Sequence, residues 1–292
     1  MSFSRWALSG YSVDVVIFLG DLADEASEAD GDQLERYAAR FHSIYNREEG
    51  KTMIYLPGDN DIGGEGGDPV TLSKIAQFEN HFGPSSPVYH IAEWLDIAPI
   101  SRLTEHGVFN LTQKPSLLSP SKMTIAVSHL PVLPLNGRFA ERVIDLVSPD
   151  LVVSAHDHRG YLFTANRETR RQEREVERFD KRNLNVPFTL QTRTRDGTMD
   201  LSSLVWEVVV PTCSYRMGVQ VRIEKVLRIE KIFTSNQEMG LGLMVVSKSG
   251  ETFYANLWLP GRYCNHQSLP HKNKMNCQTA PVGAITTFRQ VL

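Results

Sequence analysis

The sequence is poor in cysteine, has little net charge and contains no long apolar run. Its three cysteines, Cys213, Cys264 and Cys277, are scattered without a Cys-x-x-Cys pair, which argues against a zinc cluster or a disulfide framework. One bridge between Cys264 and Cys277 stays open as an alternative. No stretch reaches the ~18 apolar residues of a membrane-spanning helix, and the N-terminus shows no signal-peptide pattern. A net charge of −3 gives no basic bias, so we expect no nucleic-acid partner.

The sequence does have enough apolar residues, 41% of 292, for one large α/β domain. Short β-branched or apolar runs alternate with helical periodicity, which indicates βαβ units and a parallel or mixed sheet. Strands are expected at 13–19, 52–56, 123–127 and 151–153, two short ones within 94–111, and helices at 30–46, at 139–147 and from an Asp68 N-cap to Phe82. Strands at 204–210, 241–246 and 252–259 are expected to form a second sheet.

We expect a single domain over residues 1–262, with its chemistry within 13–160. The charge-rich stretch 166–183 is interpreted as a solvated helix or flexible loop, with a docking surface as the alternative. A tandem near-repeat at 222–227 and 228–233 indicates an insertion over 219–238. The polar tail 263–292 lacks periodicity and is expected to be poorly ordered.

Four polar motifs follow four of the expected strands. Open α/β sheets place their ligands beyond the carboxyl ends of the strands, so these motifs should converge on one edge. Carboxylate, amide and imidazole groups at one edge are the ligand set of a two-metal hydrolase. The motifs are Gly20-Asp21-Leu22-Ala23-Asp24, Gly58-Asp59-Asn60-Asp61, Ser128-His129-Leu130-Pro131 and Ala155-His156-Asp157-His158.

From 14 to 158 this order resembles the calcineurin-like metallophosphoesterases, whose signature runs Asp-x-His, Gly-Asp, Gly-Asn-His-Asp/Glu, His and Gly-His-x-His. Residues 20–25, 56–64 and 210–217 look most like the membrane-bound branch that removes ethanolamine phosphate from GPI-anchor glycans. The resemblance implies two mixed sheets in an α/β/β/α sandwich and phosphodiester hydrolysis. It also implies two divalent ions (Mn²⁺ first, Fe or Zn²⁺ as alternatives), a GPI glycan substrate and a location in ER or Golgi membranes.

The resemblance also carries roles to individual residues. Asp21 matches the carboxylate that bridges both metals, and Asp59 stands where the family has an Asn ligand. His129 and His156 match ligands of the second metal, and His158 matches a ligand of the first. In the His-x-His pair we expect both rings on one face of an extended segment.

Two further roles are expected in catalysis and one in substrate binding. Asn60 stands where the family has the His that protonates the leaving group; an amide cannot serve as that acid, but it can hydrogen-bond a phosphoryl oxygen. Asp61 matches the acidic residue that orients position 60. Arg216 is a candidate phosphate-binding residue. Read without the resemblance, Gly58-Asp59-Asn60-Asp61 is also a good polar turn.

The family's first motif is missing, because no Asp or His precedes Asp14. This absence leaves a rival hypothesis, that the chain is an inactive fragment or pseudoenzyme. A third hypothesis is a phosphodiesterase of broad specificity.

Overall fold

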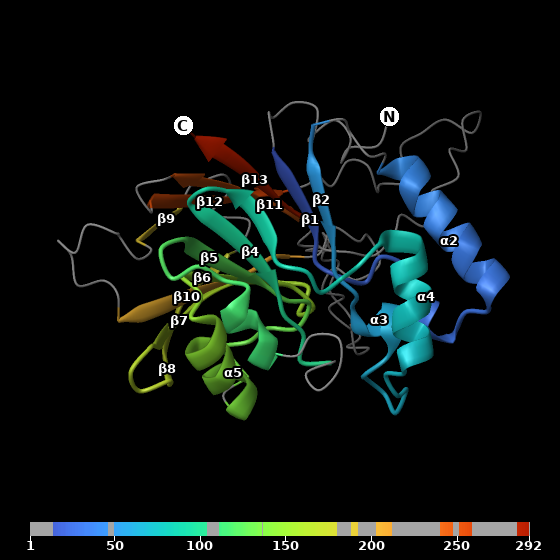
Figure 1. Ribbon diagram of the computed structural model, residues 1–292, viewed down its shortest axis with the longest axis horizontal. Helices are drawn as coiled ribbons and strands as arrows, with labels where there is room; N and C mark the ends of the chain where they lie inside the picture. Colours follow the sequence, from blue (N-terminus) through green and yellow to red (C-terminus); the bar gives the residue numbers. More distant parts are fainter. Residues whose placement is uncertain are drawn as a thin grey trace, which may run out of the picture.

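The computed structural model describes residues 14–45, 50–103, 111–135, 137–179, 188–191, 203–211, 240–247, 251–258 and 285–291. In these residues two β-sheets pack against each other, and helices cover the outer face of each (Figure 1).

The six-stranded sheet contains the strands that precede the two aspartate motifs. Its order is β2 (Thr52–Tyr55), β1 (Val15–Phe18), β13 (Ile285–Val291), β11 (Gly240–Ser247), β12 (Glu251–Trp258) and β9 (Phe188–Gln191). β1 and β2 are parallel, and Phe18 lies opposite Tyr55. Both strands therefore end at the same edge.

The seven-stranded sheet contains the strands that precede the two histidine motifs. Its order is β3 (Tyr89–Ala92), β4 (Leu95–Pro99), β5 (Met123–Val127), β6 (Leu151–Ser154), β10 (Leu204–Val209), β7 (Gly160–Asn166) and β8 (Gln172–Phe179). β4, β5, β6 and β10 run parallel, so β5 and β6 also end at a common edge.

The described helices are mostly short. They are η1 (Ala26–Glu28), α2 (Gly31–Ile44), α3 (Asp59–Ile62), α4 (Leu72–Phe82), η2 (Leu111–Ser116), α5 (Arg138–Arg142) and the π-helical turn η3 (Val143–Val147). Asp30 caps α2 by accepting from Gln33 N–H at 2.8 Å, as its sequence position suggests. Asp68 does not cap α4: Thr71 does, and Asp68 instead forms an ion pair with Lys74. The helix expected at 139–147 is divided between α5 and η3.

Three apolar clusters define the layers. One lies between the sheets and joins Ile17 and Ile54 to Ile125 and Leu151. A second packs Phe18 against α2 and α4. A third packs the other face of the seven-stranded sheet against α5 and η3. The α/β/β/α arrangement expected from the resemblance is thus confirmed. Alternate residues of each central strand face different clusters, as a buried strand requires.

Several expectations about the later chain differ from the structure. Residues 204–209 do not belong to a separate second sheet with 241–246 and 252–259, because β10 pairs in parallel with β6. Residues 172–179, expected as a helix or loop, form β8 on the edge of the same sheet. Residues 285–291, expected to be poorly ordered, form β13 between β1 and β11. β10 and β13 depend on pairing with distant residues, and β8 forms a hairpin with the preceding strand β7. Local periodicity reveals none of these partners.

Other sequence features lie outside the described residues, namely the near-repeat within 219–238, the segment 259–284, Arg216 and the three cysteines. In the part of the chain that the structure describes, no helix combines the length and apolarity needed to cross a membrane.

The core between the sheets should contribute strongly to stability. Leu151 is fully buried there, whereas Leu72 is 75% exposed at the start of α4. We expect Leu151→Ala to lower the free energy of unfolding by about 2–5 kcal/mol, because it removes buried surface and leaves a cavity. The matched Leu72→Ala should change it by less than about 0.5 kcal/mol. Urea denaturation measures both, and equal effects would contradict this layering.

Candidate metal centre

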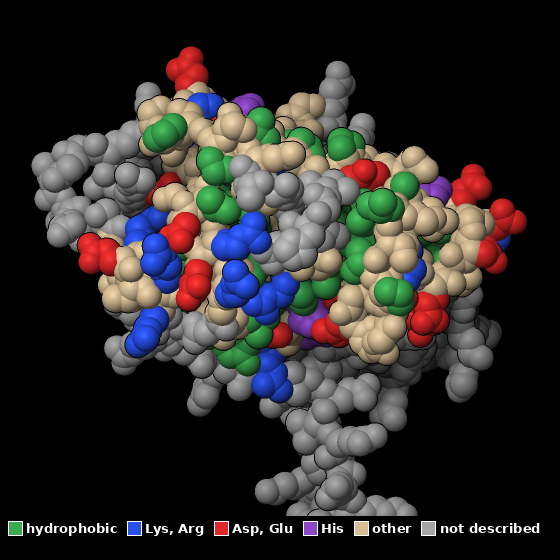
Figure 2. Space-filling view, turned by 60° about the horizontal axis from the view of Figure 1, so that its bottom comes forward, with side chains coloured by type: hydrophobic (Ala, Val, Ile, Leu, Met, Phe, Trp, Pro, Cys, Tyr) green, Lys and Arg blue, Asp and Glu red, His purple; other side chains and the backbone are tan. Residues whose placement is uncertain are grey.

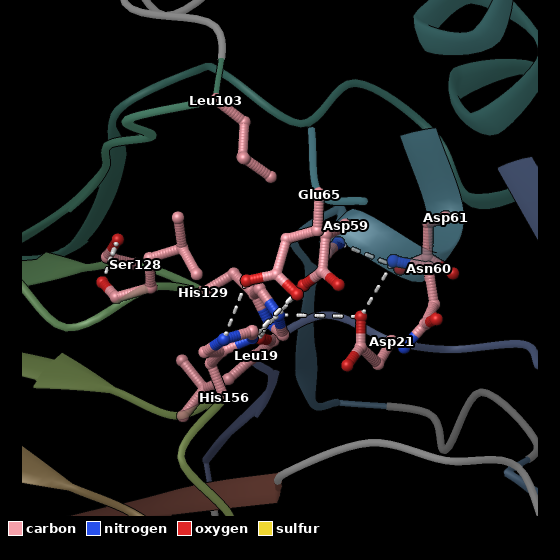
Figure 3. Close-up of polar contacts among 12 residues, drawn as sticks. Leu19, Asp21, Asp59, Asn60, Asp61, Glu65, Leu103, Ser128, His129 and His156 are labelled. Carbon is pink, nitrogen blue, oxygen red and sulfur yellow. Dashed lines mark hydrogen bonds and ion pairs between the residues drawn. The ribbon is translucent and has the colours of Figure 1, made fainter. Parts of the chain in front are cut away.

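Four side chains from four strand ends meet at one point. Asp21 follows β1, Asp59 begins α3 after β2, His129 follows β5 and His156 follows β6 (Figure 3). Each offers one donor atom, and these atoms all lie within 4.8 Å of one another. The two aspartates come from one sheet and the two histidines from the other. The sequence therefore predicted the convergence correctly, but the site spans the edges of two packed sheets instead of one.

The backbone turns sharply at three motif residues. Asp21, His156 and His158 have φ values of 56°, 68° and 59°, in the left-handed region that non-glycine residues seldom adopt. Such strained residues concentrate at functional sites, where the surrounding structure holds them. The expectation that His156 and His158 lie on an extended segment is therefore wrong. Among the described residues, His158 is not part of the four-residue group.

Two glycines allow the motif loops to approach closely. A Cβ on Gly58 would lie 2.5 Å from the backbone N of Asp21 and would also collide with its carboxylate. A Cβ on Gly20 would lie 2.8 Å from the backbone N of Gly58 and would overlap the His129 ring. Each motif glycine is thus required by a neighbouring motif.

The buried Asp61 carboxylate joins the two aspartate motifs. It accepts from Gly58 N–H at 2.8 Å, from Leu22 N–H at 3.0 Å and from Ala23 N–H at 3.2 Å. Burial and the nearby Asp21 charge raise the pKa of Asp61 to about 7, although these N–H donors favour the ionised form. Asp61 therefore organises the loops around the site.

The four donor atoms lie within contact distance of one another. His129 Nε2 lies 2.8 Å from Asp59 Oδ1 and 3.4 Å from Asp21 Oδ1, and His156 Nδ1 lies 3.1 Å from Asp59 Oδ1. Burial alone would raise the pKa of Asp59, but hydrogen bonds and charge from both histidines hold it well below its usual range.

Burial lowers the pKa of His129, but the Asp21 charge and the Asp59 hydrogen bond outweigh it and raise the pKa to about 9. The hydrogen bond to Asp59 is the main cause that raises the pKa of His156. The carboxylates thus attract positive charge to this point.

This donor set fits a divalent cation. Two carboxylate oxygens and two imidazole nitrogens suit Mn²⁺, Fe or Zn²⁺. His129 Nδ1 lies 2.6 Å from the Leu19 carbonyl oxygen, which can only accept, so Nδ1 carries the proton in neutral His129 and leaves Nε2 free to bind a metal. Asp21, Asp59, His129 and His156 are the residues that would hold the ion.

The remaining predicted site residues are placed less centrally. Asn60 donates its backbone N–H to Asp21 Oδ1 at 3.2 Å. The Asp61 carboxylate contacts backbone N–H groups in the motif loops, as described above.

Sequence reasoning missed Glu207, which is fully buried in β10. Its carboxylate accepts from Val132 N–H at 2.9 Å, Leu133 N–H at 2.6 Å and the Ser154 hydroxyl at 2.5 Å. It therefore links the segment after His129 to the strand before His156. An acidic residue inside an otherwise apolar strand was the available signal.

The comparisons agree with this geometry. Residues 3–160, more than half of the chain, match the family model described as Calcineurin-like phosphoesterase. The chain therefore belongs to the calcineurin-like phosphoesterase family, and this membership implies hydrolysis of phosphoesters. A comparison with curated proteins finds no match.

Gly58 offers a test of the close contact between the aspartate motifs. We expect Gly58→Ala to weaken Mn²⁺ binding at least about tenfold, because the added methyl displaces Asp21. Loss of a residue that only orients a metal ligand already lowers metal affinity by about 10–100-fold. Gly31→Ala is the matched control, since a Cβ there meets nothing within 4 Å. Calorimetric Mn²⁺ titration measures both, and unchanged binding by Gly58→Ala would count against the proposed ligand arrangement.

Glu207 should make stability depend on pH. Burial raises its pKa from 4.5 to about 7 despite three hydrogen bonds that favour the ionised form. The folded chain thus holds this proton more tightly than the unfolded chain. The resulting contribution of Glu207 to the free energy of unfolding is complete below about pH 4.5 and is lost as the pH rises to about 7. At 1.36 kcal/mol per pKa unit it amounts to at most about 3 kcal/mol.

The test compares the wild type with Glu207→Gln by urea denaturation in chelator at pH 4.5 and pH 7.5. The wild-type stability relative to the variant should fall over this range. Glu35→Gln, on the exposed face of α2, should track the wild type. A constant difference between wild type and Glu207→Gln would contradict the raised pKa.

Proposed function

We propose that this chain is a metal-dependent phosphodiesterase that removes ethanolamine phosphate from GPI-anchor glycans. The observation that carries the phosphodiesterase proposal is the meeting of four donor atoms within 4.8 Å. Family membership supports phosphoester hydrolysis, and the ligand chemistry supports dependence on a divalent metal.

The proposed roles follow from position. Asp21 and Asp59 supply two negative charges to balance a divalent cation, and neutral His129 and His156 complete its ligands. A bound cation would polarise the phosphoryl group and make water more acidic. By family likeness Asp21 also bridges to a second ion, which His158 helps to bind. Asn60 lies in the same short helix as Asp59, α3, and its proposed role is to hydrogen-bond a phosphoryl oxygen through its side-chain amide.

The surface charge is favourable for an anionic substrate. Lys and Arg side chains gather beside a histidine on the face shown in Figure 2. One basic residue of the chain, Arg102, packs over the Phe139 ring at 5.5 Å and donates to the Leu135 carbonyl at 3.1 Å, which fixes it beside α5. Positive charge on a protein surface raises the local concentration of anionic phosphoesters.

The GPI substrate rests on sequence resemblance. Segments 20–25, 56–64 and 210–217 support it, and a location in ER or Golgi membranes belongs to the same proposal. Arg216, proposed to bind phosphate, lies in the third segment and outside the described residues.

One observation favours the rival hypothesis of an inactive chain. Asn60 stands where the family has its proton donor, so acid catalysis needs another residue. Broad-specificity phosphodiester hydrolysis is the alternative for an active chain.

The test of catalysis uses bis(p-nitrophenyl) phosphate with added Mn²⁺. We expect chelator-sensitive turnover that Asp21→Asn and His129→Gln each reduce by more than about 100-fold, because loss of a ligand should exceed the effect of losing an outer-shell partner. His81→Gln, on the outer helix α4, should retain activity. Activity that survives in Asp21→Asn, or that ignores chelator, would contradict the proposed site.

Substrate choice needs a separate assay. A GPI glycan that carries ethanolamine phosphate should lose it, and mass spectrometry detects the change. Hydrolysis of the generic diester without action on this glycan would support broad specificity. Metal binding without hydrolysis of either substrate would support the inactive chain.

A further inference from the structure

The His156 ring is contacted by a carboxylate at each of its two nitrogens. Nδ1 lies 3.1 Å from Asp59 Oδ1, inside the four-residue group, and Nε2 lies 3.2 Å from Glu65 Oε1 (Figure 3). Asp59 and Glu65 are only six residues apart, so one short segment contacts both ring nitrogens. Glu65 lies outside the four sequence motifs.

The segment between these carboxylates is closed by backbone hydrogen bonds. Gly63 N–H donates to the Asp59 carbonyl at 2.8 Å, and Gly64 N–H donates to the Asp68 carbonyl at 2.7 Å. Asp68 N–H in turn donates to the Glu65 carbonyl at 2.9 Å. Glu65 thus lies on a compact loop tied directly to α3, which positions Asp59.

Side chains and glycines hold this loop in place. Gly64 has a φ of 123°, and a Cβ there would collide with Leu103, so the backbone itself packs against that side chain. Lys74 in α4 pairs with Asp68 and donates to the Pro69 carbonyl at 3.1 Å. The position of Glu65 is therefore set by contacts on both sides of the loop.

The two histidines of the site are oriented by different means. His129 donates Nδ1–H to the Leu19 carbonyl, a backbone acceptor that no substitution removes. His156 instead has the Glu65 side chain at its outer nitrogen. In metal sites, a carboxylate at the outer nitrogen of a ligating histidine fixes the tautomer and the ring orientation.

We propose that Glu65 is a positioning residue that accepts Nε2–H of His156 and so presents Nδ1 to the cation. This inference rests on the proposed metal-dependent function. Glu65 is not assigned to the ion itself, because it lies outside the four-residue group and contacts the other ring nitrogen, Nε2. Its side chain is 57% exposed, so its loss should affect metal binding and leave folding intact.

The first test is calorimetric titration of Mn²⁺ into the metal-stripped chain. Glu65→Ala should weaken binding by about 10- to 100-fold, the usual effect of removing such a partner. Glu65→Gln should lose less, because its amide oxygen still accepts from Nε2–H. Glu35→Gln on α2 is the matched control and should bind as the wild type does. The melting temperatures of all four metal-free proteins should agree.

The second test reads the tautomer directly. In the Zn²⁺-loaded protein, long-range ¹⁵N–¹H spectra should show a proton on Nε2 of His156 and metal on Nδ1. In Glu65→Ala the Nε2–H signal should move and exchange faster with water. A purely structural role for Glu65 would leave this signal in place.

The outcomes separate this inference from the proposed function. Tight Mn²⁺ binding by both the wild type and Glu65→Ala would overturn the role of Glu65 and leave the function standing. Weakened binding in Glu65→Ala, with no hydrolysis by the wild type, would support Glu65 and overturn the phosphodiesterase. A wild type that binds no Mn²⁺ would overturn both.

Discussion

The site depends on one buried carboxylate. Asp61 accepts backbone N–H groups from Gly58, Leu22 and Ala23, and so holds the loops after β1 and β2 at a fixed separation. Burying a charge is costly unless it is hydrogen-bonded, so these contacts have to be maintained together. Because β1 and β2 are parallel neighbours in register, their ends are already level. By bonding to both loops, Asp61 fixes the distance between Asp21 and Asp59.

A second carboxylate does the same for the histidines. Glu207 joins the segment after β5 to Ser154 at the end of β6. Each pair of candidate ligands thus has its own buried acid nearby, Asp61 in α3 for the aspartates and Glu207 in β10 for the histidines. The apolar cluster between the sheets then sets the distance between the two pairs. A metal at the meeting point would bridge two sheets, so the precision of the site comes from the core beneath it.

The sequence predicted the local features well and the long-range pairing poorly. Residues 15–18, 52–55 and 123–127 form strands as expected, because continuous β-branched runs between turns are typical of buried strands. Strand β13 was missed and β10 was given to the wrong sheet, since partner choice lies in residues far along the chain. The convergence of the four candidate ligands could be predicted from the order of the motifs along the chain. The contacts of Glu65 and Glu207 could not, because they depend on loop closure and on the neighbouring strand.

Asp59 determines much of the electrostatics of the site. Its carboxylate contacts both His129 and His156, and those contacts hold its own pKa low while favouring protonated rings. Without metal, protons on the histidines supply the positive charge that the aspartates attract. A divalent cation must displace those protons, so binding should strengthen as pH rises. Two carboxylates against one divalent cation give local neutrality, which an Asn at 59 would not provide. The Asp59 carboxylate therefore adds negative charge that favours a divalent cation at this position.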